Sequence, residues 1–587
     1  MSKSSEIRES IRRILIGILK KDEEAADWII EGSEAEGLRG RFAGKEKPLG
    51  VVSFDVDRIK EFVFTSTKPL EVHGASEIVN DLTLRDYRKG ESGLPACSVH
   101  QILADHSLGD DNVIFAGGGT GLLLVPAEQT EQIAKEIRSR FAKHSQTGSC
   151  SIVWRRFYPH ELVIGPDSES KQADVLPRGV SLVGGKETSS TGFGSIVRLL
   201  ADELRQVKEE NPATPMPPLP GYVRPCEACG IRAAIEPDPE QRDWLCSSCA
   251  AHRGRGRRER KRLRDHEPDL TTAETINDIA GTDEERAGHV AFIHADADGM
   301  GQKLSKMTRM EDLALFSRTV SAVIKRARED LVRKHKLAGR YQAPIVGGDD
   351  IFLIVPAAKA VPIASDLMEQ LADEFRREAK EFDGENQRVA EELEDVSISL
   401  GFVVVPAHFD IRFSARYAEA LLRQAKRGRY LKGEACLDYS VITDGSPLTL
   451  ELQELRKSIY LRESPTWKLR LTGRPITVSR FRQIRQWMEE LEAANVPRSQ
   501  LKIIEDLLHR ASPRVARLNI RYQWIRVDAW KRLFKEGQVN KEDQDKMKVW
   551  LDELVLHEIG PRSYESSFVD LIELYDLRRS GHDEMEA

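Results

Sequence analysis

The sequence predicts an α+β chain of several domains: two similar α+β halves, a metal-binding insert between them and a helical C-terminal domain. Three observations support this fold class. One order of strands and paired glycines occurs twice, four cysteines with metal-site spacing lie between the two copies, and the C-terminal part is rich in leucine and poor in glycine. The length of 587 residues also exceeds that of a single ordinary domain.

The composition is that of a globular protein, with 40% hydrophobic and 31% charged residues. The net charge of −7 excludes a bulk polyanion binder, so any contact with nucleic acid has to come from local basic patches. No run approaches the roughly 18 apolar residues of a membrane span, and we therefore expect no membrane partner. Seven cysteines, four of them in one metal-like cluster, predict a reducing, cytoplasmic location.

The first half of the repeat follows a short N-terminal segment. Residues 1–48 have a helical pattern, and a first α+β domain is expected at residues 49–211. Its apolar strand ends in two acids, Asp55 and Asp57, for which a solvated strand end is an equally good interpretation. Further on, the run FAGGGTGLLLVPA has glycines between apolar stretches, which predicts a hairpin with a glycine tip.

The second half, at residues 288–445, repeats this order. Its strand ends at Asp296, and its hairpin run IVGGDDIFLIVPA aligns with the first run glycine by glycine. The copies differ at the hairpin tip, where the second has two acids in place of Gly119 and Thr120. Because a metal clamp needs ligands from both the strand and the hairpin, we expect the first copy to hold no metal site of its own.

The candidate catalytic residues are Asp296, Asp349 and Asp350, whose carboxylates meet if the strand lies beside the hairpin in one antiparallel sheet. Alone they would raise one another's pKa values, and a pair of Mg²⁺ or Mn²⁺ ions removes that penalty. Such ions can activate an attacking hydroxyl and neutralise a leaving pyrophosphate. Gly347 and Gly348 let phosphates approach the backbone. We therefore predict a two-metal nucleotidyl-transfer site, although the tetrapeptide alone is equally compatible with an exposed turn.

A buried strand at Val396–Val405 and an amphipathic helix at Arg416–Lys426 complete the second half. The ammonium of Lys426 is expected to meet the triphosphate of a nucleotide. A solvated helix end is an equally good interpretation of the arginines that follow.

The cysteine cluster lies in a linker and zinc-binding domain at residues 212–287. Sixteen residues separate Cys226-x2-Cys229 from Cys246-x2-Cys249, the spacing of a structural Zn²⁺ site. Four thiolates fill the tetrahedron and leave no position for a catalytic water, so we expect the zinc to be structural.

Two basic stretches each have two interpretations. The run Arg253–Arg264 holds eight basic residues and one acid and can bind an RNA backbone, but a solvated helix or loop is favoured. Residues 446–587 are predicted to be the helical C-terminal domain, and the stretch Arg521–Lys535 mixes aromatic and basic side chains. That stretch can face RNA or a partner subunit, but a packed helix with a basic exterior is favoured.

The ordered set of two α+β units, a four-Cys insert, Gly-Gly-Asp-Asp in the second unit only and a helical C-terminus resembles a known family. It is similar to the large polymerase/cyclase subunit of type III CRISPR RNA-guided effector complexes. The resemblance implies that the two units are ferredoxin-like palm domains, the first degenerate and the second catalytic. The segment with Gly74, Ala75 and Ser76 resembles the family's first-palm signature, which lies near a bound nucleotide.

The resemblance implies a function in antiviral defence. Members of the family make cyclic or linear oligoadenylate messengers from ATP when target RNA is bound, as one 3′-hydroxyl attacks the α-phosphate of the next nucleotide. By motif, Asp349 and Asp350 match the family's hairpin carboxylates, and Asp296 matches its strand-end metal ligand. The partners implied are ATP, a CRISPR RNA, target RNA and other Cas subunits.

One departure concerns a nuclease. Many members carry an N-terminal HD domain that cuts single-stranded DNA, whereas only residues 1–48 precede the first palm here. A two-metal nuclease needs several His and Asp ligands on a helical bundle, and we therefore expect no DNase activity in this chain.

Three other functions compete with this reading. A diguanylate cyclase shares the palm and the hairpin, but such enzymes usually carry Glu-Phe after the first acid, whereas Asp350-Ile351-Phe352 stands here. They also pair as homodimers, whereas this chain already holds a second palm. A non-catalytic zinc-bearing scaffold of an RNA complex is disfavoured by the intact acids. A stand-alone defence nucleotide cyclase would differ by binding no short RNA.

Overall fold

The computed structural model describes residues 3–84, 93–166, 192–210, 218–281, 288–382, 384–443, 450–534 and 546–579. Parts of the predicted linker and zinc-binding domain, residues 212–217 and 282–287, therefore lie outside the described residues. The chain divides into two compact units. One comprises Met1–Thr275, Ala297–Phe352 and Leu371–Val396, and the other comprises Ile276–Asp296, Leu353–Gln370 and Ser397–Ala587. None of the described helices is long and apolar enough to cross a membrane.

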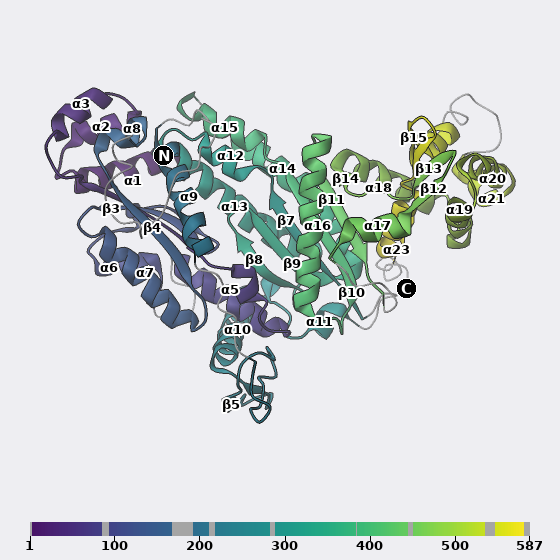
Figure 1. The fold of residues 1–587 in the computed structure, drawn as a ribbon, viewed down its shortest axis with the longest axis horizontal. Helices are drawn as coiled ribbons and strands as arrows, with labels where there is room; N and C mark the ends of the chain where they lie inside the picture. The colour runs from purple at the N-terminus through teal and green to yellow at the C-terminus, as the bar shows by residue number, and fades with distance from the viewer. Residues whose placement is uncertain are drawn as a thin grey trace. The chain divides into compact units, whose positions relative to one another are not determined.

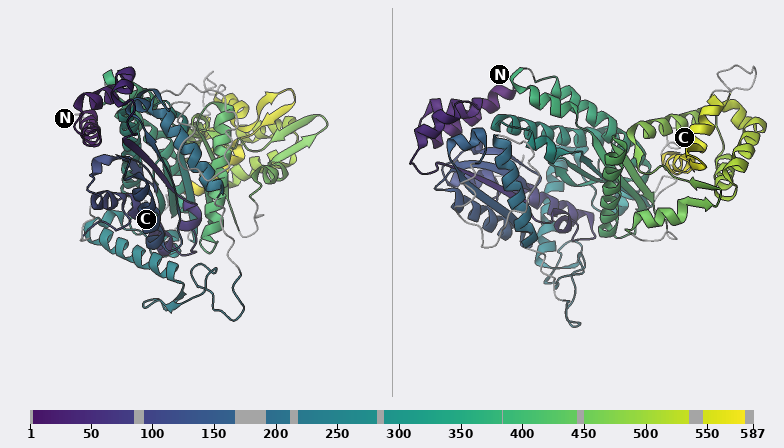
Figure 2. Two further views of the ribbon diagram at one scale, coloured as in Figure 1. Left: turned by 60° about the vertical axis from the view of Figure 1, so that its left-hand side comes forward. Right: turned by 45° about the horizontal axis from the view of Figure 1, so that its top comes forward.

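The N-terminal helices, purple in Figure 2, belong to the first unit and pack against one another and against a short helix of the first half. These helices are α1 (Lys3–Ile18), α2 (Glu23–Glu31), α3 (Ala35–Phe42) and α8 (Pro159–Ile164). The side chain of Asp22 caps α2 by accepting the Ala25 amide at 3.1 Å, and Gly32 ends α2 in the left-handed conformation. The predicted helical N-terminus is thus observed.

The first half forms a four-stranded antiparallel sheet in the order β2-β3-β1-β4 (Figure 1). Its strands are β1 (Leu49–Val56), β2 (Val113–Gly117), β3 (Thr120–Pro126) and β4 (Cys150–Phe157). The helices of this half are α4 (Ile59–Val63), α5 (Pro69–Thr83), α6 (Val99–Asp105), α7 (Thr130–Ser145) and α9 (Phe193–Glu210). Helices α7 and α9 pack on β1 and β4, and the predicted hairpin is β2–β3.

The zinc-binding region contains a two-stranded sheet, β5 (Glu236–Pro237) and β6 (Trp244–Leu245), followed by the long helix α10 (Ser247–His266). Helix α10 packs along α5 of the first half. Short segments lead on to the second half through α11 (Ile276–Ala280).

The second half forms a six-stranded sheet in the order β14-β11-β10-β7-β9-β8. Its strands are β7 (His289–Ala297), β8 (Gln342–Gly347), β9 (Asp350–Pro356), β10 (Ile398–Pro406), β11 (Cys436–Val441) and β14 (Ile476–Thr477). The helices between them are α12 (Met300–Ser305), α13 (Met310–Lys334), α14 (Ala360–Ala379), α15 (Gln387–Glu394) and α16 (Ile411–Lys432). Helix α16 connects the parallel strands β10 and β11 and packs on both. The predicted strand, hairpin and helix positions of this half are confirmed.

The C-terminal part is mostly helical, as predicted, and its core is aromatic. The helices are α17 (Leu452–Tyr460), α18 (Val478–Ala493), α19 (Arg498–Arg510), α20 (Pro513–Arg526), α21 (Asp528–Leu533) and α23 (Phe568–Arg579). Trp524, Trp530 and Trp550 are buried and lie within 6.5 Å of ring neighbours in one cluster. The stretch Arg521–Lys535 was expected to be a packed helix, and this is correct up to Phe534. Lys535 lies outside the described residues.

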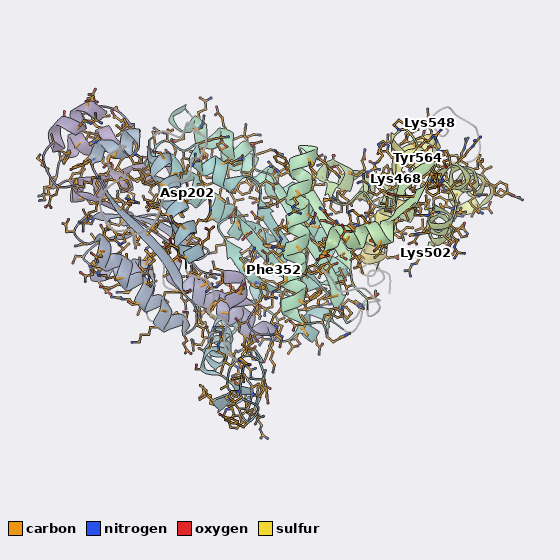
Figure 3. All side chains as sticks on the ribbon, in the orientation of Figure 1. Asp202, Phe352, Lys468, Lys502, Lys548 and Tyr564 are labelled. Carbon is orange, nitrogen blue, oxygen red and sulfur yellow. The ribbon has the colours of Figure 1, made fainter. Side chains whose placement is uncertain are left out.

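A small sheet, which the sequence did not predict, accompanies these helices in the order β12-β13-β16-β15. Its strands are β12 (Leu461–Ser464), β13 (Trp467–Arg470), β15 (His557–Gly560) and β16 (Ser563–Glu565). Lys468 and Tyr564, both labelled in Figure 3, come from the neighbouring strands β13 and β16. The predicted multidomain fold of helices and sheets is confirmed, and the C-terminal part contains a sheet as well as helices.

Candidate functional site

The two Gly-Gly hairpin tips touch each other through their backbones. A side-chain carbon built on Gly347 would lie 2.6 Å from the Cα atom of Gly118, so neither position tolerates a larger residue without a shift. Gly348 has a φ of +60°, which favours glycine at the turn. The glycines thus have a structural reason in both copies.

The backbone brings the end of β7 to the tip of the second hairpin. Asp296 is the last residue but one of β7, and the amide of Ala297 donates to the carbonyl oxygen of Asp349 at 3.2 Å. Asp350 begins β9, the strand next to β7 in the sheet. The predicted neighbourhood of strand end and hairpin is therefore observed at the level of the backbone.

Lys426 lies on α16 and forms an ion pair with Asp296. The side chains are 37% and 20% exposed, so the pair is open to solvent on one side. The sequence predicts that Lys426 binds a nucleotide, but it does not predict the ion pair with the candidate metal ligand Asp296. The roles of Asp296, Asp349, Asp350 and Lys426 in chemistry stay predictions.

The strand-end acids of the first half contact other groups of the protein. Lys208 Nζ lies 2.5 Å from Asp55 Oδ2, and burial raises the pKa of Asp55 while the ammonium opposes that shift. Asp57 accepts hydrogen bonds at 2.7 Å from the hydroxyls of Ser149 and Ser151. Both strand-end acids of this half are thus occupied by protein groups.

The four cysteines converge as predicted. Their sulfur atoms all lie within 4.8 Å of one another, all four residues are buried, and none forms a disulfide. Within the described ranges, no other set of three or more Cys, His, Asp or Glu residues meets this criterion. Four clustered thiols are the donor set of a tetrahedral Zn²⁺ site, so the residues present fit a structural zinc ion.

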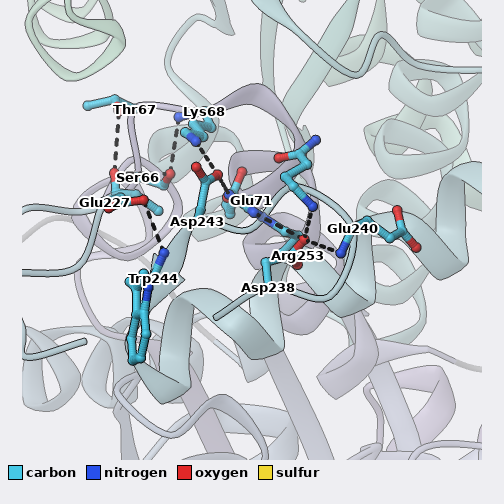
Figure 4. A network of polar contacts seen from close by, with 12 residues as sticks. Ser66, Thr67, Lys68, Glu71, Glu227, Asp238, Glu240, Asp243, Trp244 and Arg253 are labelled. Carbon is cyan, nitrogen blue, oxygen red and sulfur yellow. Dashed lines mark hydrogen bonds and ion pairs between the residues drawn. The ribbon is translucent and has the colours of Figure 1, made fainter. Parts of the chain in front are cut away.

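The basic run after the last cysteine lies in helix α10, and part of its charge is neutralised inside the protein, as Figure 4 shows for Arg253. Arg253 is 1% exposed and donates to Glu71 of α5 at 2.7 Å and to Asp243 at 2.8 Å. Arg255 is also buried and pairs with Asp81 of α5 at 2.9 Å. The expectation of a solvated run is therefore wrong for these two arginines, because α5 supplies buried carboxylates.

Gly74, Ala75 and Ser76 lie in α5 and are buried. A side chain on Gly74 would clash with the carbonyl oxygen of His252 in α10, so the glycine permits the two helices to pack closely. This packing accounts for Gly74 without a ligand. The predicted contact of the three residues with a nucleotide stays a prediction.

Comparison with protein families identifies the second half. Residues 289–432 match the family model described as Cas10/Cmr2, second palm domain. The resemblance to the large subunit of type III CRISPR effector complexes is thereby confirmed for this domain. A comparison with curated proteins finds no match.

Comparison with solved structures finds similar chains at low identity. The Csm1-Csm4 cassette in complex with cA4 is 13% identical over 94% of this chain and 72% of that chain, with a TM-score of 0.46. Csm1 in T. onnurineus is 14% identical over 92% and 71%, with a TM-score of 0.48. The Csm1-Csm4 subcomplex of the type III-A CRISPR-Csm interference complex is 13% identical over 93% and 72%, with a TM-score of 0.46.

Proposed function

We propose, from the Cas10/Cmr2 second palm domain at residues 289–432, that this chain is the nucleotidyltransferase subunit of a type III CRISPR effector complex. In this proposal it makes cyclic or linear oligoadenylate messengers from ATP when target RNA binds. The observation that supports the proposal best is the family match of a domain that retains Asp296, Asp349 and Asp350. The first half, with Gly119 and Thr120, supports it by contrast, because the hairpin there folds without acids.

In the proposed reaction, Asp296, Asp349 and Asp350 would hold two divalent cations, Mg²⁺ or Mn²⁺. Such ions, when bound, lower the pKa of an attacking 3′-hydroxyl and neutralise the leaving pyrophosphate. Gly347 and Gly348 present backbone to the phosphates without side-chain hindrance, and Lys426 supplies a positive charge near them. The protein thus contributes position and charge, and no side chain has to form a covalent intermediate.

The remaining parts have supporting roles in this proposal. Cys226, Cys229, Cys246 and Cys249 hold a structural Zn²⁺ ion, and Gly74, Ala75 and Ser76 face a nucleotide from the first palm. The domains are a helical segment 1–48, palms at 49–211 and 288–445, the zinc-binding domain 212–287 and the C-terminal domain 446–587.

The proposed partners are a CRISPR RNA, target RNA and other Cas subunits in the cytoplasm. Csm1-Csm4 cassettes have been crystallised in complex with cA4, and the partners proposed here are of the same kind.

The test is pyrophosphate release from ATP or GTP by the purified complex with Mg²⁺ and target RNA. Asp350→Asn is expected to reduce release from ATP by at least about 100-fold, because it removes a metal ligand. The matched control is Asp57→Asn, which changes a strand-end acid of the first half and is expected to leave release within about twofold of wild type. Equal activity of wild type and Asp350→Asn would refute the site, and preferential use of GTP would favour a diguanylate cyclase.

A further inference from the structure

Helix α20 of the C-terminal part has apolar side chains on its outward face as well as on its inward face. The helix packs beside α19 and α21 (Figure 1). Its inward face is buried through Ala516, Ile520 and Trp524. Its outward face carries four large apolar side chains, each between 47% and 64% exposed: Val515, Leu518, Tyr522 and Ile525.

These four residues form one continuous surface, which we call the outer stripe of α20. They are three or four positions apart in the sequence, and a helix turns by about 100° per residue, so their side chains fall within about 80° of one another. The outer stripe is about 15 Å long, because its ten residue steps rise by about 1.5 Å each. Contiguous exposed apolar surface is typical of a site that contacts another molecule.

Exposed arginines flank the outer stripe on both sides. By the same helical geometry, Arg514 and Arg521 lie along one side and Arg526 lies along the other. Helix α20 contains no acidic residue. Within the described part of the chain, no carboxylate pairs with any of these three arginines, and Arg526 donates to the Tyr522 hydroxyl. The outer stripe thus has a positive border whose charge is not neutralised by the protein itself.

This combination of charge and shape selects one kind of partner. A second copy of α20 would place arginine against arginine, so the outer stripe does not pair with itself. Single-stranded RNA would neutralise the arginines, but bases bind by stacking on aromatic faces, and three of the four side chains of the stripe are aliphatic. A protein helix with apolar residues at the same spacing and carboxylates beside them complements both the stripe and its border.

We propose that the outer stripe of α20 is a docking surface for an acidic amphipathic helix of another protein subunit. Leu518, the most exposed of the four apolar side chains, is the centre of the contact. Arg514, Arg521 and Arg526 face carboxylates of the partner at its edge. This surface is independent of the nucleotide chemistry proposed for the second palm.

The test is photo-cross-linking in the assembly isolated from its native cells, with Leu518→benzoylphenylalanine in the full chain. We expect a cross-link to a segment of another protein that has apolar residues three and four positions apart and more Asp and Glu than Lys and Arg. The matched control is Ile559→benzoylphenylalanine on β15, because Ile559 is 50% exposed and lies outside α20. A cross-link from position 518 to RNA, to a second copy of this chain or to the same segment as the control would overturn the proposal, and so would the absence of a cross-link.

Charge and polarity variants test the chemistry of the contact by the amount of the cross-linked subunit that is isolated with the chain. Leu518→Asp places a charge at the apolar centre and is expected to reduce this amount at least about tenfold. Arg514→Glu combined with Arg521→Glu is expected to reduce it about three- to tenfold, because the border then repels carboxylates.

Ile559→Asp is the matched control and should leave the amount within about twofold of wild type. All these positions are exposed, so the melting temperatures of the variants should equal that of the wild type. Equal amounts of the subunit with Leu518→Asp and Ile559→Asp would refute the docking surface. Full retention of the subunit by the double arginine variant would refute the acidic character of the partner.

Discussion

The interface between α5 and α10 yields a prediction with a large effect, because its charges are buried. Arg253 and Glu71 are each 1% exposed and face one another across the two helices. Arg253→Met removes the cation and leaves the Glu71 carboxylate in a dry interface. Burial already raises the pKa of Glu71 in the wild type, with Arg253 opposing that shift, so the variant removes the opposing interaction.

The expected loss of stability follows from the desolvation of an uncompensated charge. Breaking a buried ion pair by removing one partner costs about 3–5 kcal/mol. Asp243 also accepts a hydrogen bond from Arg253 at 2.8 Å, but it is 20% exposed and can recover water, so we add nothing for it. For a unit of about 350 residues, each kcal/mol lowers the melting temperature by roughly 1.4 °C. The transition that reports the first unit should therefore fall by about 4–7 °C.

The assay is thermal denaturation of the zinc-loaded chain, with hydrogen exchange to locate the effect in α5 and α10. Arg258→Met is the matched control, because Arg258 is an exposed arginine of the same helix, and it should change stability by less than about 0.5 kcal/mol. The double variant Arg253→Met, Glu71→Gln should recover much of the loss, because no buried charge is then left alone. Equal melting temperatures for Arg253→Met and Arg258→Met would refute the reasoning.

Three further predictions concern the same region. Burial lowers the pKa of His252 from 6.5 to about 4, so the unfolded chain takes up a proton on this imidazole before the folded chain does. About 3 kcal/mol of the free energy of unfolding is therefore present above pH 6.5 and is lost as the pH falls toward about 4. His252→Asn should flatten the pH dependence of the melting temperature over that window, and an unchanged slope would contradict this. Gly74→Ala should cost about 1–3 kcal/mol by overpacking against α10, whereas Gly254→Ala, whose side chain would make only an ordinary contact of 3.7 Å with Arg258, should be neutral or stabilising in chemical denaturation; equal effects would exclude the packing explanation. Cys249→Ser should abolish stoichiometric zinc in the purified protein, measured by atomic absorption, and a full zinc content would show that the ion is held elsewhere.

Local sequence patterns predicted the hairpins and strand ends well. Each glycine tip lies directly between its two apolar runs, and the acids beside Ala297 directly end their own apolar strand, so short-range chemistry decides each of these elements. The same holds for the four cysteines, whose spacing alone predicted their convergence. Because the hairpin occurs twice in the chain, its two copies can be compared. The first copy forms the turn without acids, so the turn itself does not require them.

Long-range pairing was beyond that reasoning. Asp296 forms an ion pair with Lys426, and Arg253 forms one with Glu71. The partners are distant in the sequence, so no local pattern predicts these pairs. The basic run therefore suggested a solvated helix, although buried carboxylates on α5 neutralise part of it. The C-terminal sheet was missed because strands of three or four residues are too short to show an alternating pattern.

The central claim is that the second palm joins nucleotides with Asp296, Asp349 and Asp350. The most direct measurement is the mass of the product formed by the isolated native complex with target RNA and ATP. We expect cyclic or linear oligoadenylates from the wild-type complex and none from a complex with Asp349→Ala, Asp350→Ala that still binds RNA. The same products from both complexes would contradict it.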